Sequence, residues 1–249
     1  MIEDDIIAEA ARIVEAGGRR GLALRLLGGV AVRLHAPSAA HHALARAYQD
    51  IDLAAPARQS GEVELLLGGL GYEPDRPFNL LNGDHRLLFY DRGRGRQVDV
   101  FVGRFEMCHR LPLEERLAVE PLTLPLAELL LTKLQIVQLN EKDVRDICAL
   151  VLDHPLGEGD AETLNLPRIT QLCADDWGLW KTATISIRKA QDFCEAYDLE
   201  ARARLTIVER LGLLRVALAK APKSLRWRMR AAVGERVQWY ELPEEVRRG

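Results

Sequence analysis

The sequence predicts an α+β fold in which strands and helices share the first half of the chain and helices fill the second. Two observations predict it. Up to about residue 124, short apolar runs of strand length alternate with amphipathic stretches, glycine pairs and a hairpin turn. From residue 126 onward, apolar residues recur every three or four positions, as in helices. We therefore expect an α+β domain over residues 1–124 and a helical domain over residues 125–249.

The composition is that of a globular protein. Of the 249 residues, 48% are hydrophobic and 29% are charged, which is enough apolar material for a core. The net charge of −3 gives no global indication of nucleic-acid binding. The four cysteines lack C-x-x-C spacing, so we expect reduced thiols rather than a zinc site or disulfides. The acidic N-terminus does not resemble a signal peptide, and no apolar run is long enough to span a membrane, so we expect a cytoplasmic protein without a membrane partner.

The first half divides into elements bounded by glycine, proline and turn residues. Each boundary follows from a change of hydrophobic period or from a helix-ending residue. The expected elements are a helix over 3–16 that ends at Gly17-Gly18, a strand over 22–27, a helix over 30–35, a helix or loop over 38–48, a strand over 50–53, a helix over 62–70 that ends at Gly71, and two strands over 85–90 and 97–102 joined by a turn.

The second half consists of helical patterns separated by short connections. We expect helices from residue 126 and over 141–152, a loop over 153–164, and helices over 165–174, 177–197, 199–220 and 224–233.

The stretch Asp50-Ile51-Asp52-Leu53 is the first candidate site. In a strand, alternate side chains share a face, so the two carboxylates lie together, opposite Ile51 and Leu53. Like charges this close need a positive neighbour, and a hard divalent cation is the usual one. Asp99 has the same apolar flanks in the second hairpin strand.

Two simpler interpretations of these carboxylates remain open. The Asp50–Leu53 stretch alone is also typical of a polar turn followed by a solvated edge residue. Arginines can also replace a metal as neutralising partners, because buried carboxylates need positive charge or hydrogen bonds. The arginines nearest in sequence are those of the hairpin turn, namely Arg92, Arg94 and Arg96.

A glycine pair and two helices supply further candidates. Gly28-Gly29 lies between a strand and a helix, where backbone N–H groups can approach a phosphate closely. Gly17-Gly18 and Gly68-Gly69 show that a glycine pair can also simply mark the end of a helix. Further along, Lys133 lies in the leucine-rich helix, and Asp143 and Asp146 share one face of the next. The simpler interpretation of these three is an ion-pair group on the helix surface.

The segment 199–236 is strongly basic. It contains ten Lys and Arg residues against three Glu, a local excess of seven positive charges. Such a segment can bind an RNA backbone, and Trp227 within it can stack on a base. The alternative is a solvated basic face with Trp227 in the core or at an interface.

The chain resembles the polymerase-β-like nucleotidyltransferase superfamily in three motifs and in their order along the sequence. The motifs are Gly28-Gly29, Asp50-Ile51-Asp52 and Val98-Asp99-Val100. The leucine-rich helix with Lys133, followed by Lys142-Asp143-Val144-Arg145-Asp146, is similar to the AbiEii-type nucleotidyltransferases of toxin–antitoxin systems. The likeness covers roughly residues 20–152. It implies a nucleotidyltransferase fold, with a mixed β-sheet flanked by helices, followed by an all-helical C-terminal region.

The resemblance also implies a reaction, the transfer of a nucleoside monophosphate from an NTP to an acceptor hydroxyl. Asp50, Asp52 and Asp99 would bind Mg²⁺ or Mn²⁺. Gly28, Gly29, Lys133, Asp143 and Asp146 would bind the nucleotide. RNA or tRNA is the implied acceptor and an antitoxin protein the implied partner. The competing classes are a small-molecule, antibiotic-type nucleotidyltransferase and a non-catalytic nucleotide-binding or interaction protein.

Overall fold

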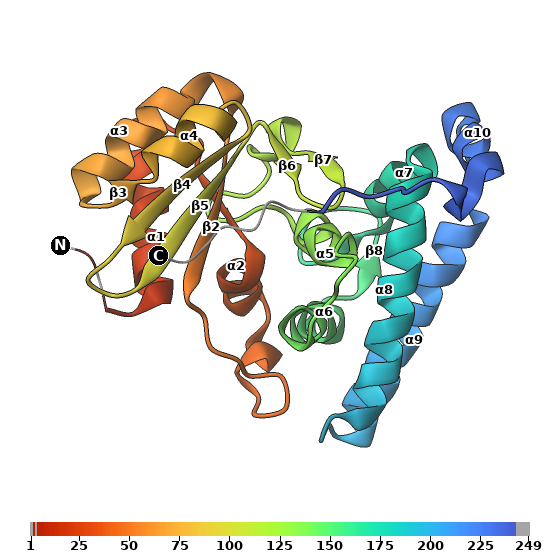
Figure 1. Cartoon of the computed structure of the whole chain (residues 1–249). Helices are drawn as coiled ribbons and strands as arrows, with labels where there is room; N and C mark the ends of the chain where they lie inside the picture. The colour runs from red at the N-terminus through yellow and green to blue at the C-terminus, as the bar shows by residue number, and fades with distance from the viewer. Residues whose placement is uncertain (1, 3, 243–249) are drawn as a thin grey trace.

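The computed structural model describes residue 2 and residues 4–242, and it confirms the α+β class. Its described residues contain ten α-helices and one five-stranded sheet, along with two short strand pairs. Sheet and helices occupy the first half of the chain, and the second half is helical apart from one of the strand pairs (Figure 1).

The sheet is mixed, with the strand order β1-β2-β5-β4-β3. Only β2 and β5 run parallel, and the other three pairings are antiparallel. This order makes β2 and β5 the interior strands that carry the three candidate aspartates. Asp52 lies directly opposite Asp99 on one side and Leu27 on the other. The strands are β1 (Arg25–Leu27), β2 (Asp50–Ala55), β3 (Glu73–Pro74), β4 (Arg86–Asp91) and β5 (Arg96–Val102).

Four helices belong to the first half. They are α1 (Ile6–Gly18), α2 (Gly28–His35), α3 (Ser60–Leu70) and α4 (Arg76–Asn82). Helix α2 follows β1 without a connecting residue and begins at the glycine pair, two residues earlier than expected. The segment 38–48 forms a 3₁₀ turn over Pro37–Ala40 and then loop. Helix α4 was not predicted, although Asp75 caps it and a proline follows at its start.

The helices of the second half begin with polar caps where the sequence offers them. Asn140, Asn165, Asp176 and Ser224 each accept a hydrogen bond from a backbone N–H of the first helical turn. The helices are α5 (Leu126–Leu134), α6 (Glu141–Asp153), α7 (Leu166–Asp175), α8 (Trp177–Ala196), α9 (Ala201–Lys220) and α10 (Leu225–Val233).

Two strand pairs lie outside the main sheet. β6 (Arg104–Glu106) and β7 (Arg110–Pro112) form an antiparallel pair directly after β5. β8 (Leu156–Gly157) and β9 (Leu164–Asn165) pair in parallel within the segment expected to be a loop. The second half is therefore not wholly helical. Each strand of that pair has only two residues, too few for an alternating pattern to be visible in the sequence.

The two halves pack on each other through α2. A contiguous apolar core runs from α1 to α9, and α2 packs against both α5 and α6. Backbone hydrogen bonds also hold the segment just before α5 against β1, because Leu26 donates to Leu122 and Leu124 donates to Leu26, at 2.9 and 2.8 Å. These contacts bring α5 and α6 beside the glycine pair of α2. None of the described helices is both long and apolar enough to cross a membrane.

Candidate functional site

A pocket of about 170 Å³ lies where β2 and the start of α2 meet α5 and α6. Five of the eight predicted site residues line it, and they come from four separate segments of the chain. The predicted residues are Gly29, Asp50, Asp52, Lys133 and Asp143, and their neighbours in the lining are Arg46, Ala47, Tyr48, Gln49, Asn140 and Lys142. Gly28 and Asp146 contact lining residues from just outside, whereas Asp99 lies beyond Asp52 on β5.

The glycine pair is required by close approaches from two charged side chains. Gly28 has a φ of +67°, and a Cβ there would lie 1.9 Å from Oδ2 of Asp52. A Cβ on Gly29 would lie 1.6 Å from Nη2 of Arg46. By contrast, Gly18 and Gly68 have open space around them, as expected for glycines that only punctuate. The Gly28-Gly29 pair thus lets a carboxylate and a guanidinium reach the first turn of α2.

The N-terminus of α2 keeps polar groups available to a ligand. Leu27 occupies the N-cap position and makes no side-chain hydrogen bond to the helix. The first N–H groups of a helix have no intrahelical acceptor, and the positive end of the helix dipole favours anions. With Arg46 beside it, this helix start suits a phosphate group.

Asp52 is the carboxylate that the fold leaves uncompensated. Burial, together with the nearby charges of Asp99 and Asp50, raises the pKa of Asp52 to about 7, although Lys133 and Arg86 act in the opposite direction. Within the described residues, no hydrogen bond or ion pair reaches its side chain. A bound cation would remove this energetic cost.

Asp99 has the opposite environment, because Arg86 and Gln97 bind it. Nε and Nη2 of Arg86 both lie 2.7 Å from Oδ1 of Asp99, and Nε2 of Gln97 donates to Oδ2 at 2.6 Å. Asp99 and Arg86 are both buried. Arg86 thus neutralises Asp99, a role that the three-carboxylate prediction gives to a metal ion. Whether Asp99 joins a metal site stays a prediction.

Among the described residues, the recorded partners of the hairpin-turn arginines are other groups. Arg92 pairs with Glu73 at 2.7 Å, Arg94 pairs with Asp4 at 2.8 Å, and Arg96 donates to the Asp4 carbonyl. The expectation that an arginine neutralises a site carboxylate is confirmed for Asp99, but the arginine is Arg86, on the strand adjacent to Asp99.

The donor set fits a magnesium–triphosphate complex better than a closed protein cage. The described residues contain no group of three or more His, Cys, Asp or Glu side chains that could hold a metal ion. Mg²⁺ commonly binds one or two carboxylates and takes its other ligands from water and substrate phosphates. Asp50 and Asp52 are two such carboxylates, and both line the pocket.

Lys133 lies at the centre of a buried ionic group. Its Nζ lies 2.9 Å from Asp143 and 2.8 Å from Asp146, and Arg46 binds Asp146 through two hydrogen bonds of 2.8 Å. Because Lys133, Asp143 and Asp146 are buried, the surface ion-pair interpretation is wrong.

The charges of this group reinforce one another. Burial alone lowers the pKa of Lys133, but Asp146 and Asp143 outweigh it, so that pKa is raised. Burial alone raises the pKa of Asp146, but Lys133 and Arg46 outweigh it, so that pKa is lowered. Two cations are thus held in place at the pocket, where they can meet an anionic ligand.

Sequence reasoning left Arg46 unassigned and missed Tyr48 at this pocket. The Arg46 guanidinium stacks over the Tyr48 ring, with Cζ 4.4 Å from the ring centroid. The Tyr48 hydroxyl is buried without a hydrogen-bond partner among the described residues. Both residues lie within four positions of Asp50, but only the fold shows that the loop turns them toward α2 and α6.

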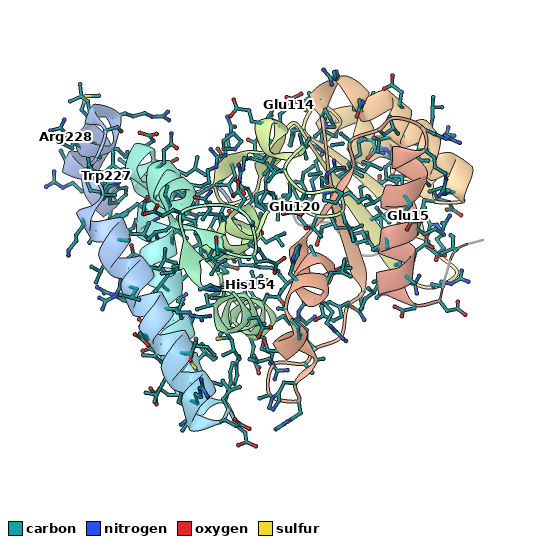
Figure 2. The ribbon with its side chains drawn as sticks, turned by 180° about the vertical axis from the view of Figure 1, so that it is seen from behind. Glu15, Glu114, Glu120, His154, Trp227 and Arg228 are labelled. Carbon is teal, nitrogen blue, oxygen red and sulfur yellow. The ribbon has the colours of Figure 1, made fainter. Side chains whose placement is uncertain are left out.

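The basic segment 199–236 presents fewer free charges than its sequence suggests. Four of its ten cations bind backbone carbonyls of this chain: Arg204, Arg210, Lys223 and Arg230. Trp227 is half-buried and packs edge-to-face on Trp180, with centroids 5.2 Å apart, so it is an interface residue rather than an open stacking platform. Figure 2 shows Trp227 and Arg228 on α10, at the outer end of the helical half.

Neither a model of a known protein family nor any curated protein matches this chain.

Proposed function

We propose that this chain is a metal-dependent nucleotidyltransferase that moves a nucleoside monophosphate from an NTP to an acceptor hydroxyl. One observation carries the proposal. One glycine of the pair, two strand carboxylates and a lysine paired with an aspartate meet in one pocket, although they lie up to 114 positions apart in the chain. The proposal agrees with the likeness of these motifs to AbiEii-type nucleotidyltransferases.

Each group has a distinct part in the proposed reaction. The start of α2, with Arg46 and Lys133, would bind the triphosphate, and Asp50 and Asp52 would hold the metal ion. When bound, Mg²⁺ or Mn²⁺ neutralises phosphate charge and polarises the α-phosphate. Asp143 and Asp146 fix the position of Lys133, and Arg86 with Gln97 fixes Asp99 beside Asp52.

Positioning and charge neutralisation would supply most of the catalysis, as in phosphoryl transfer generally. The acceptor oxygen forms a bond to the α-phosphorus while the bond to the β-phosphate oxygen breaks. Pyrophosphate then leaves, and the hydroxyl proton passes to a carboxylate of the site or to water. An enzyme that draws on the NTP pool in this way would act in the cytoplasm.

For the acceptor, we propose an RNA such as tRNA, in a toxin-like activity. The support is the exposed cations of the basic segment: Arg202, Arg215, Lys220, Arg226, Arg228 and Arg236. A cationic drug would need an acidic pocket, but three cations among the lining residues balance the three carboxylates. The small-molecule alternative therefore has no specific support.

The test is transfer of label. The purified chain is incubated with Mg²⁺ and each α-³²P-labelled NTP in turn, with total RNA or with a small-molecule extract as acceptor. We expect one NTP to label an RNA species and to release pyrophosphate in equal amount. If no NTP raises the melting midpoint and none transfers label to either fraction, the proposed function is wrong.

A further inference from the structure

Two exposed apolar surfaces lie at opposite ends of the molecule. One is on α10, where Leu225, Met229 and Val233 recur every four residues on one face and are all exposed. The other is on α3 and α4, where Leu80 and Leu81 are 86% and 79% exposed. Figure 1 shows α3 and α4 at one end of the molecule and α10 at the other. Apolar side chains grouped in this way mark interaction surfaces.

The α10 surface is basic around its apolar stripe. Arg226 and Arg228 flank the stripe, both are exposed, and neither forms an ion pair with another described residue. The opposite side of α10 is occupied, because Trp227 packs on Trp180 of α8 there. Arg226, Met229 and Val233 also line a hollow of about 890 Å³ that they share with Trp177 and Trp239 of the same chain. The three apolar side chains of the stripe are nevertheless 41–65% exposed.

The α3–α4 surface has the complementary character. A hollow of about 350 Å³ lies between the two helices, and Leu80, Leu81 and Leu87 contribute apolar atoms to its lining. Two carboxylates, Glu64 and Asp84, line it as well. Asp84 already lies 2.7 Å from Nδ1 of His85 and 3.5 Å from Nη2 of Arg104, so Glu64 carries most of the charge complementarity. Met229 is 59% exposed, and an unbranched methionine side chain fits irregular hollows.

We infer that the two surfaces bind each other between copies of this chain, with the α10 stripe of one copy in the α3–α4 hollow of the next. Met229 enters the hollow against Leu80 and Leu81, and Arg226 and Arg228 face Glu64 and Asp84. Because two different surfaces meet, the contact is heterologous, and it extends head to tail unless the rotation between copies closes a ring. Neither surface lines the pocket at Asp52, so the inference does not depend on the proposed function.

Two variants, each lacking one surface, test the inference through their mixture. The full chain, Leu80→Glu and Met229→Glu are compared by sedimentation velocity over a range of concentrations. Both substitutions are at exposed positions, so the fold should remain intact, and circular dichroism checks this. The full chain should form species larger than a monomer that grow with concentration. Each variant alone should remain monomeric, with association weakened by about tenfold or more. Their mixture should form dimers and nothing larger, because only one intact pair of surfaces is left.

Two controls address surface specificity and charge. Leu213→Glu, at an exposed apolar position on α9 outside both surfaces, should associate like the full chain. Combining Arg228→Glu with Glu64→Arg should recover association that either change alone weakens. A full chain that stays monomeric at every concentration would overturn the inference. So would a monomeric mixture of the two variants, or binding of α10 to a different protein or to anionic vesicles without self-association.

Discussion

Asp52 and Asp99 face each other on neighbouring strands, yet the fold treats them in opposite ways. Arg86 and Gln97 hold Asp99 with two short hydrogen bonds, and a second guanidinium nitrogen of Arg86 forms an ion-pair contact with it. Asp52 has no such partner among the described residues, and its pKa is raised to about 7. Asp52 is half-buried, and removing a carboxylate from water without a partner is costly. The difference therefore separates a carboxylate that is paired within the fold from one that the proposed function assigns to a metal ion.

The largest expected effect of breaking this contrast is on activity. Asp52→Asn keeps the shape of the side chain but removes the charge proposed to hold the metal–triphosphate complex. We expect label transfer to fall by about 10³-fold. Asp198→Asn, at an exposed aspartate outside the pocket, is the matched control and should keep its activity. Equal activity in the Asp52 and Asp198 variants would remove Asp52 from the site.

On stability, the larger effect should come from Asp99. Asp99→Ala leaves the buried Arg86 without its partner, which should lower the free energy of unfolding by about 3–5 kcal/mol in urea titration. The double variant Arg86→Met with Asp99→Leu replaces both charges and should recover most of that loss. If Asp99→Ala is as stable as the parent chain, the ion pair does not hold this part of the sheet.

Asp52, in contrast to Asp99, should destabilise the fold, by an amount that depends on pH. Between pH about 4 and about 7 the unfolded chain loses the Asp52 proton while the folded chain keeps it, so this residue lowers stability as the pH rises. Asp52→Asn should therefore be more stable than the parent chain at pH 8, by about 1.4 kcal/mol for each pKa unit of the shift, and the difference should vanish near pH 4. Urea titrations across this range measure it. A variant that is less stable than the parent chain at pH 8 would contradict the raised pKa.

The smallest effect concerns the glycine that admits Asp52. Gly28→Ala places a Cβ against Oδ2 of Asp52 in a backbone with positive φ, and should cost about 1–3 kcal/mol of stability. Gly18→Ala, in open space at the end of α1, should be neutral or stabilising by up to about 1 kcal/mol. Thermal unfolding of the two variants measures the contrast. Equal melting midpoints would mean that the two glycine pairs serve the same purpose.

Most of the local secondary structure could be predicted from the sequence. Alternation at Asp50–Leu53 predicted a strand, and the helical periods predicted α5 and α6. The two-residue strands β8 and β9 and the short helix α4 were too brief to show a period, although the Asp75 cap was a usable signal for α4.

The partners of these residues depended on tertiary structure. Arg86 lies 13 positions before Asp99 and reaches it only because β4 and β5 pair in this register. Arg46 is 100 positions from Asp146 and meets it only after α2 packs on α6. Neighbours in sequence suggested the wrong arginines for Asp99, because strand register is set by the whole sheet.

The central claim is that Asp52 is the uncompensated half of a metal–nucleotide site, and calorimetric binding tests it most directly. Each NTP, in a form that resists cleavage at the α-phosphate, is titrated into the full chain and into Asp52→Asn, with Mg²⁺ and with EDTA. We expect one or more NTPs to bind the full chain with Mg²⁺, and to bind at least about tenfold more weakly without Mg²⁺ or in the variant. No binding to the full chain, or Mg²⁺-dependent binding of the same strength in Asp52→Asn, would contradict the claim.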